Sequence, residues 1–167
     1  MDRRQVSSKK TLVLLLVAFL VPVALAAVVL KAKWYQGGAT NHGQLLNNLS
    51  YQQLQQPNPV HQQWQIITFV QSQCSPSCQA HLQQLKQVHV ALGRERPRVH
   101  PIAFSDAPLS APDGVAVVVQ PQLQPLLPEL AVVIVDPLGQ WVLHYQTDEF
   151  SGLLKDLRKL LKLSRIG

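Results

Sequence analysis

The longest hydrophobic run of the chain extends from Thr11 to Leu30, twenty residues without a charge. A helix of this length crosses the ~30 Å hydrocarbon core of a bilayer, so the pattern predicts one transmembrane helix over residues 11–30. Basic residues flank the run at Arg3, Arg4, Lys9 and Lys10 on one side and at Lys31 and Lys33 on the other. The positive-inside bias places residues 1–10 in the cytoplasm and the rest of the chain outside. The length favours a retained anchor, although Ala24-Leu25-Ala26 leaves cleavage as a signal peptide open.

Beyond the anchor, residues 31–63 are rich in Gln and Asn with weak periodicity, which is typical of a spacer and an irregular lead-in. The apolar run from Trp64 to Val70 predicts a strand. Next, apolar residues at spacings of three and four predict an amphipathic helix that Gly93 ends. These residues are Leu82, Leu85, Val88 and Leu92.

The second half of the chain contains further strand patterns. Residues 98–104 alternate well enough for a strand, whereas 108–128 is interrupted by prolines and leaves room for a short strand or helix. Two strands, 131–135 and 140–146, flank Asp136-Pro137-Leu138-Gly139, whose residue order is typical of a type I turn. A final helix, with Ser151 as its expected cap, carries a leucine stripe at Leu153, Leu154, Leu157, Leu160 and Leu161.

This order of elements predicts a thioredoxin-like α/β domain, a three-layer sandwich, over residues 64–167. The net charge of +6 does not change that picture, because it is concentrated at the two ends. Residues 1–33 carry +5, residues 34–150 carry −3 and residues 151–167 carry +4. A mildly acidic middle argues against nucleic acid as a partner, and basic ends favour a nearby lipid bilayer. The basic face of the last helix is read as solvated, with docking to lipid or an acidic partner as the alternative.

Candidate chemistry is concentrated in the two cysteines, Cys74 and Cys78, which form a C-x-x-x-C motif between the first predicted strand and helix. Near a helix N-terminus a thiolate is stabilised. Such a pair can exchange with a disulfide or bind Cu(I). For exchange, Cys74 is predicted to attack and Cys78 to resolve. Outside the membrane the environment is oxidising, so a merely structural disulfide stays an open alternative.

Several motifs in this order resemble the Sco/SenC group of membrane-anchored, thioredoxin-like copper proteins, and more narrowly the short Sco-like proteins associated with proteobacterial cytochrome c oxidase genes. They are Asn41-His42-Gly43-Gln44-Leu45-Leu46, the strand before the cysteine motif, the stretch from Val132 to Gly139 and the closing helix. The resemblance implies a single-pass protein of the bacterial inner membrane with its domain in the periplasm. It implies a role in oxidase assembly, either delivering copper to subunit II or keeping the cysteines of that site reduced. Subunit II or assembly factors are then the partners.

One position departs from the family pattern. The His that is the third copper ligand in Sco proteins falls here on Pro128, so the carry-over of metal ligands stops at Cys74 and Cys78. Pro128, or Pro125, could instead be the cis-proline of thioredoxin folds. His81 is a weak substitute ligand, since a helix would place it on the same face as the cysteines, but an isolated His on a helix is more often a surface or half-buried residue. His144 and His42 are weaker still.

Two hypotheses follow. The first is a Sco-like dithiol protein that assists oxidase assembly by thiol-disulfide maintenance or Cu(I) handling, with thiol-disulfide oxidoreductase as its enzyme class if it is an enzyme. The second is a membrane-tethered interaction subunit that retains the fold without chemistry.

Overall fold

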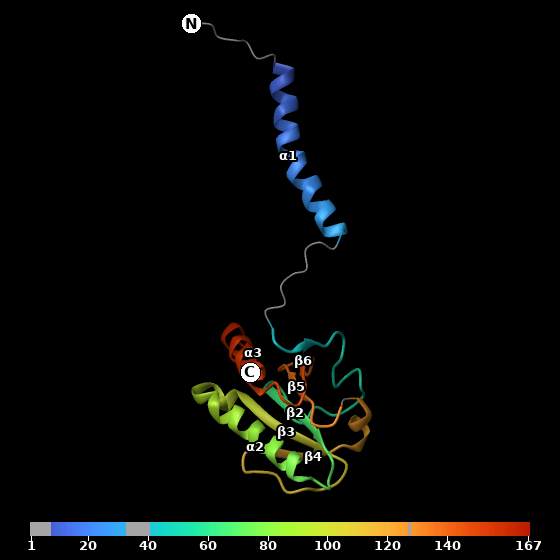
Figure 1. Ribbon diagram of the computed structural model, residues 1–167, viewed down its shortest axis with the longest axis vertical. Helices are drawn as coiled ribbons and strands as arrows, with labels where there is room; N and C mark the ends of the chain where they lie inside the picture. Colours follow the sequence, from blue (N-terminus) through green and yellow to red (C-terminus); the bar gives the residue numbers. More distant parts are fainter. Residues whose placement is uncertain (1–7, 33–40, 127) are drawn as a thin grey trace. The chain divides into compact units, whose positions relative to one another are not determined.

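The computed structural model describes residues 8–32, 41–126 and 128–167. By internal contacts the chain divides into two units, Met1–Ala39 and Thr40–Gly167. Figure 1 shows the described elements along the chain. Each unit is considered by itself below.

The first unit contains one long helix, α1 (Ser8–Lys31). Its segment Lys9–Val29 is long and apolar enough to cross a membrane, and its side chains are exposed rather than packed in a protein core. Exposed leucines and valines of this density are stable only against lipid or another apolar surface. The basic residues Arg3, Arg4 and Lys33 lie outside the described residues.

The second unit is built on one mixed sheet with strand order β1-β6-β5-β2-β3-β4 (Figure 1). The strands are β1 (Gln44–Leu45), β2 (Trp64–Val70), β3 (Val99–Ser105), β4 (Ala116–Val119), β5 (Val132–Val135) and β6 (Trp141–Tyr145). Strands β2, β3 and β4 are parallel, and β5 runs antiparallel to β2. All seven residues of β2 are buried, which is typical of a central strand covered on both faces.

Both long helices of this unit, α2 (Pro76–Ala91) and α3 (Phe150–Leu163), pack on the same face of the sheet. Their leucines and valines interdigitate with Ile66, Val132 and Ile134 in one apolar cluster. The predicted stripe of α3 is confirmed, with Leu153, Leu157 and Leu161 almost completely buried. The expected cap is wrong, however. Helix α3 begins at Phe150, and Ser151 lies inside its first turn.

The opposite face of the sheet is covered without an α-helix. The lead-in segment contributes Tyr51, and the 3-10 helix η2 (Pro121–Leu126) contributes Leu123. Tyr51 packs edge-on against Phe104 and Trp141 of the sheet, and Leu123 belongs to the same apolar cluster. The third layer is therefore irregular chain, and the stretch 108–128 does contain a short strand, β4, and a short helix, η2.

The predicted helix stop and the predicted turn are both confirmed. Helix α2 ends at Ala91, and Gly93, at φ +60°, is the first residue of the 3-10 helix η1 (Gly93–Arg98) that follows it. In the β5–β6 hairpin the Gly139 amide donates to the Asp136 carbonyl at 2.9 Å. The Asp136 carboxylate accepts from the amides of Leu138 and Gln140, which is the local hydrogen bonding that favours Asp at the first position of a turn.

Candidate functional site

The cysteine motif lies where β2 ends and α2 begins. Ser75 is the N-cap residue, and its Oγ accepts a hydrogen bond from the Cys78 amide at 3.3 Å. Pro76 occupies the first helical position, where no backbone donor is needed. Cys74 therefore precedes the cap, whereas Cys78 lies in the first turn. The Ser-Pro pair before an amphipathic run is a helix-start signal that the sequence analysis could have used.

Cys74 and Cys78 form a disulfide with Cα atoms 5.3 Å apart. This separation is well within the range that disulfides adopt. Cys74 lies outside α2, so the pair does not have the spacing of two residues four apart within one helix.

The two sulfur atoms differ in environment. Cys78 is 2% exposed and belongs to the apolar cluster beneath α2, while Cys74 is partly exposed and packs against the edge of that cluster. A reactant from solution can reach Cys74 far more readily than Cys78. The asymmetry fits an attacking and a resolving cysteine, roles that stay a prediction.

A carboxylate from the neighbouring strand holds the loop before Cys74. Asp106 follows β3, and its two oxygens accept from the amide and the hydroxyl of Ser72 at 2.6 and 3.3 Å. The amide hydrogen bond from Ser72 is the largest cause of a lowered Asp106 pKa. Parallel β2 and β3 end at the same edge of the sheet, which brings these two loops together. The role of Asp106 could not be recognised from local sequence, since the contact joins residues 34 apart.

His81 lies on α2 but is buried, 2% exposed, not on the surface as a lone helical His usually is. Its Nε2 is 2.9 Å from Thr68 Oγ1, and that hydroxyl donates to the Ala131 carbonyl. Thr68 has one proton to give, so the imidazole must donate from Nε2. Burial lowers the His81 pKa to about 4, and the ring is neutral at pH 7. Its Nδ1 is buried without a hydrogen-bond partner.

The other candidate residues do not come together at one metal site in the structure. Within residues 8–32, 41–126 and 128–167, no three His, Cys, Asp or Glu side chains form a group that could hold a metal ion. His144 lies on β6, opposite Gln44 of β1. Pro128 is exposed, and its carbonyl accepts from the Ala131 amide. No described peptide bond is cis, which includes the bond before Pro125, while the bond before Pro128 involves residue 127, outside the described residues.

The Asn-His-Gly motif has a structural explanation. The buried Asp156 of α3 accepts from the amides of His42 and Gly43, from the Tyr145 hydroxyl and from His42 Nδ1 at 2.6 to 3.1 Å. Burial raises the Asp156 pKa, but these hydrogen bonds outweigh it and the pKa is lowered overall. A Cβ on Gly43 would lie 2.5 Å from the Tyr145 ring, so only glycine fits. Asp156 thereby holds the lead-in against α3.

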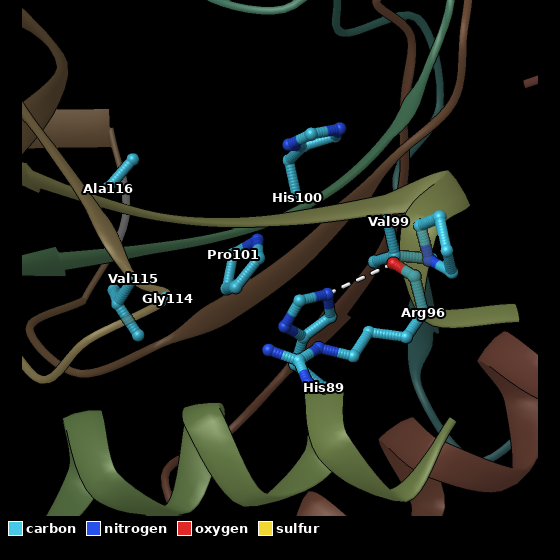
Figure 2. Close-up of a pocket in the computed structure, with 9 residues that line it drawn as sticks. His89, Arg96, Val99, His100, Pro101, Gly114, Val115 and Ala116 are labelled. Carbon is cyan, nitrogen blue, oxygen red and sulfur yellow. Dashed lines mark hydrogen bonds between the residues drawn. The ribbon is translucent and has the colours of Figure 1, made fainter. Parts of the chain in front are cut away.

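A cavity of about 650 Å³ opens at the other end of the sheet, beside η1 and the start of β3. His89 Nε2 donates to the Arg96 carbonyl at 3.1 Å in this cavity. Figure 2 shows His89 and His100 on opposite sides of the β3 ribbon. The two imidazoles therefore do not converge on one ligand position.

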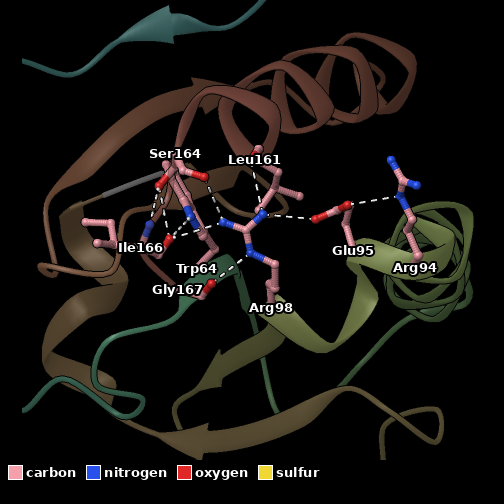
Figure 3. A network of polar contacts seen from close by, with 8 residues as sticks. All are labelled: Trp64, Arg94, Glu95, Arg98, Leu161, Ser164, Ile166 and Gly167. Carbon is pink, nitrogen blue, oxygen red and sulfur yellow. Dashed lines mark hydrogen bonds and ion pairs between the residues drawn. The ribbon is translucent and has the colours of Figure 1, made fainter.

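Next to this cavity, Arg98 joins η1 to the end of α3 (Figure 3). Its guanidinium donates to the carbonyls of Leu161, Ser164, Ile166 and Gly167 and to the Glu95 carboxylate at 2.7 to 3.3 Å. Carbonyls at a helix C-terminus lack partners within the helix. Arg98 donates the hydrogen bonds that these carbonyls would otherwise lack.

A thioredoxin-like sheet with a disulfide at the start of its first domain helix defines the class of this protein. The family model described as "Transmembrane-like, thioredoxin-like, C-terminal domain" matches residues 64–164, more than half of the chain. The chain belongs to this family. No curated protein matches it significantly.

Solved structures of similar proteins include copper-bound ScoI from Bradyrhizobium japonicum, with 16% identity, a TM-score of 0.43, and 57% of this chain and 85% of that chain covered. A SCO1/SenC family lipoprotein from Bacillus anthracis str. Ames is 11% identical with a TM-score of 0.49, covering 75% of this chain and 98% of that chain. The thioredoxin domain of thiol-disulfide oxidoreductase BVU-2223 from Bacteroides vulgatus is 14% identical with a TM-score of 0.44, covering 71% and 91%.

Proposed function

We propose that this protein is a membrane-anchored thiol-disulfide protein that acts on cysteines of an exported partner through Cys74 and Cys78. The observation that carries the proposal is the disulfide itself, with one partly exposed and one buried sulfur at the start of α2. A purely structural bridge across so short a loop would add little stability, because the loop-closure entropy that it removes from the unfolded chain is small.

The exchange proceeds in two balanced steps. In the reduced protein the Cys74 thiolate attacks one sulfur of a partner disulfide, forming a mixed disulfide and releasing the other partner sulfur as a thiolate. Cys78 then loses its proton and attacks Cys74, which re-forms the Cys74–Cys78 bond and releases the second partner thiol. The partner gains two electrons and this protein loses two. An exported dithiol reductant must restore Cys74 and Cys78 to thiols.

Two interactions position Cys74 for the first step. Asp106 fixes the preceding loop through Ser72, and Ser75 caps α2 through the Cys78 amide. A positioned nucleophile avoids part of the entropic cost of reaching the reactive geometry. Cys78, surrounded by apolar side chains, is protected until the mixed disulfide has formed.

Copper handling fits the described residues less well. Cu(I) favours soft ligands, and the reduced Cys74 and Cys78 would supply two. The His expected for the third position is Pro128, and His81 is hydrogen-bonded to Thr68 through Nε2. With no group of three candidate ligands among the described residues, we derive no step through copper and propose thiol-disulfide maintenance as the activity.

The location and the partner are inferred from sequence. The basic flanks of α1 support a cytoplasmic N-terminus and an inner-membrane anchor with the domain in the periplasm. The motif order that resembles Sco/SenC proteins supports cytochrome c oxidase assembly as the process, with the copper-site cysteines of subunit II as the substrate.

Trapping of the mixed disulfide tests this proposal. In Cys78→Ser the resolving thiol is missing, so we expect a covalent complex with a disulfide peptide that carries the subunit II cysteine pair. The matched Cys74→Ser variant, which keeps the buried thiol alone, should trap none. Equal trapping by both variants, or by neither, contradicts the assigned roles. Cu(I) titration of the reduced full chain is the companion measurement, and tight binding that Cys74→Ser abolishes would favour copper handling instead.

A further inference from the structure

The charged side chains of the Thr40–Gly167 unit are sorted between the two ends of the sheet. At the carboxyl ends of β2 and β3, here called the cysteine end, the charged groups beside the disulfide loop are acidic. They are Asp106, Glu129, Asp148 and Glu149. The opposite end, called the basic end, comprises η1, the loop before β4, the β5–β6 hairpin, the C-terminal half of α3 and residues 164–167.

Contacts between distant segments define the basic end. Arg98 of η1 donates to Leu161 and Ser164 of the α3 terminus, and Arg158 donates to the Ala91 carbonyl at the end of α2. The basic side chains gathered there are Arg94, Arg96, Arg98, Arg158, Lys159, Lys162 and Arg165, and the acidic ones are Glu95, Asp113 and Asp136. Glu95 is paired with Arg94 and Arg98, and the Asp136 carboxylate accepts from hairpin amides. The basic end is therefore net positive.

Large apolar side chains are exposed on the same end. Leu163, next to Lys162, is 73% exposed, Ile166 is 55% exposed and Leu138 at the hairpin tip is 76% exposed. Ile166 and Leu138 line one surface hollow together with Pro137. Basic residues interleaved with exposed leucine and isoleucine are the combination that binds the interface of an anionic bilayer.

We propose that the basic end docks on the anionic lipid surface of the membrane that holds α1. The proposal rests on the anchor of the proposed function and not on its thiol chemistry. Residues 33–40 separate α1 from the domain in the sequence, a stretch that covers at most ~30 Å whatever its conformation. A tether this short keeps the lipid surface at high effective concentration. This continuous presence favours lipid over a soluble acidic protein as the occupant.

Docking at the basic end also determines how far the disulfide lies from the lipid surface. Docking then holds the disulfide loop roughly 23 Å above the surface, the length of the seven-residue β2. Cys74 faces partners in the aqueous phase.

Fluorescence quenching in lipid nanodiscs tests the docking. The full chain is kept oxidised so that the native cysteines do not react with the label. One fluorophore is attached to the new cysteine of Leu163→Cys or of Asp148→Cys. Asp148 is an exposed residue at the cysteine end. In discs with anionic lipid, we expect a headgroup-region quencher to reduce the fluorescence at residue 163 and not at residue 148. The difference should disappear in neutral lipid and near 1 M salt, where the Debye length is about 3 Å.

Charge reversal supplies the matched control. Lys162→Glu with Arg165→Glu should reduce the docked population by about fivefold for each basic residue removed. Lys86→Glu with Lys155→Glu makes the same change in net charge away from the C-terminal end of α3 and should leave quenching near wild type. Circular dichroism checks that both variants fold. Equal quenching at 163 and 148, none at either, or the same loss in both charge variants would overturn the proposal.

Discussion

At the residue scale, burial determines the protonation state of His81, which lies beside the disulfide. Cys78 and His81 lie one turn apart on α2 and are both about 2% exposed. Desolvation lowers the His81 pKa to about 4, and the Thr68 hydroxyl fixes which nitrogen carries the proton. The result is a neutral imidazole in the core, hydrogen-bonded to Thr68 of β2.

This burial makes stability depend on pH. The folded His81 pKa lies below the ordinary value of about 6.5, so the unfolded chain binds the proton first as pH falls. The contribution of His81 is fully present above pH 6.5 and is lost progressively down to about pH 4. We expect His81→Gln to flatten the pH dependence of the unfolding free energy by the order of 3 kcal/mol in that window. Urea unfolding of both proteins at a series of pH values measures the difference.

A matched variant keeps this prediction specific. His61→Gln removes an exposed imidazole and should leave the wild-type pH dependence in place. If His81→Gln retains the full slope between pH 6.5 and 4, the slope comes from other groups and the account of His81 is wrong.

Only those features of the site that are local in the sequence could be predicted from it. The cysteine motif and the substitution of Pro128 for the expected His could be read directly, because they are local in sequence. The burial of His81 could not, since its hydrogen-bond partner Thr68 lies on β2, 13 residues away in the sequence. Asp106 and Asp156 were missed for the same reason, as the contacts with Ser72 and Gly43 join residues 34 and 113 apart.

At the scale of elements, the end of α3 depends on a residue from another part of the chain. Arg98 of η1 donates to four carbonyls at and beyond the helix terminus. Its side chain is 25% exposed, so these hydrogen bonds are partly shielded from water. The forked guanidinium matches several acceptors at once, which a single ammonium group cannot do.

Substitution of Arg98 should therefore destabilise the domain. We expect Arg98→Ala to lower the unfolding free energy by about 2–3 kcal/mol and Arg98→Lys by a smaller amount. Arg94→Ala removes a 93% exposed side chain of the same helix η1 and should change stability by less than about 0.5 kcal/mol. Thermal unfolding of the three variants gives the order, and an Arg98→Ala protein as stable as Arg94→Ala would contradict the assigned role.

Helices and strands were predictable where the sequence shows a clear periodic pattern of apolar residues or clear turn residues. Strands β2 and β3, helices α2 and α3 and the β5–β6 hairpin were expected because their apolar spacing or turn residues are clear. Strand β1 has two residues and η1 and η2 have six each, too short for a periodicity to be recognised. The lead-in was expected to be irregular. Its packing through Tyr51 could not be foreseen, since one buried aromatic carries no pattern.

At the scale of the whole molecule, the proposed function uses the apolar helix, the thioredoxin-like domain and the disulfide together. The described residues contain one helix that is apolar enough to span a membrane, and the thioredoxin-like sheet has the disulfide at one end and basic and exposed apolar residues at the other. On the proposed function, this polarity directs Cys74 toward exported partners. Fold class was predictable because the order of elements is itself a strong constraint.

Complementation of a strain that lacks this protein tests the central claim most directly. The strain receives the full-length chain or its Cys74→Ser, Cys78→Ser double variant, both checked for equal amounts in the membrane fraction, and cytochrome c oxidase activity is measured. If the dithiol does the work, the wild-type chain restores activity and the double variant does not. Full activity with the double variant would contradict the account and leave the protein as a membrane-tethered assembly subunit without thiol chemistry.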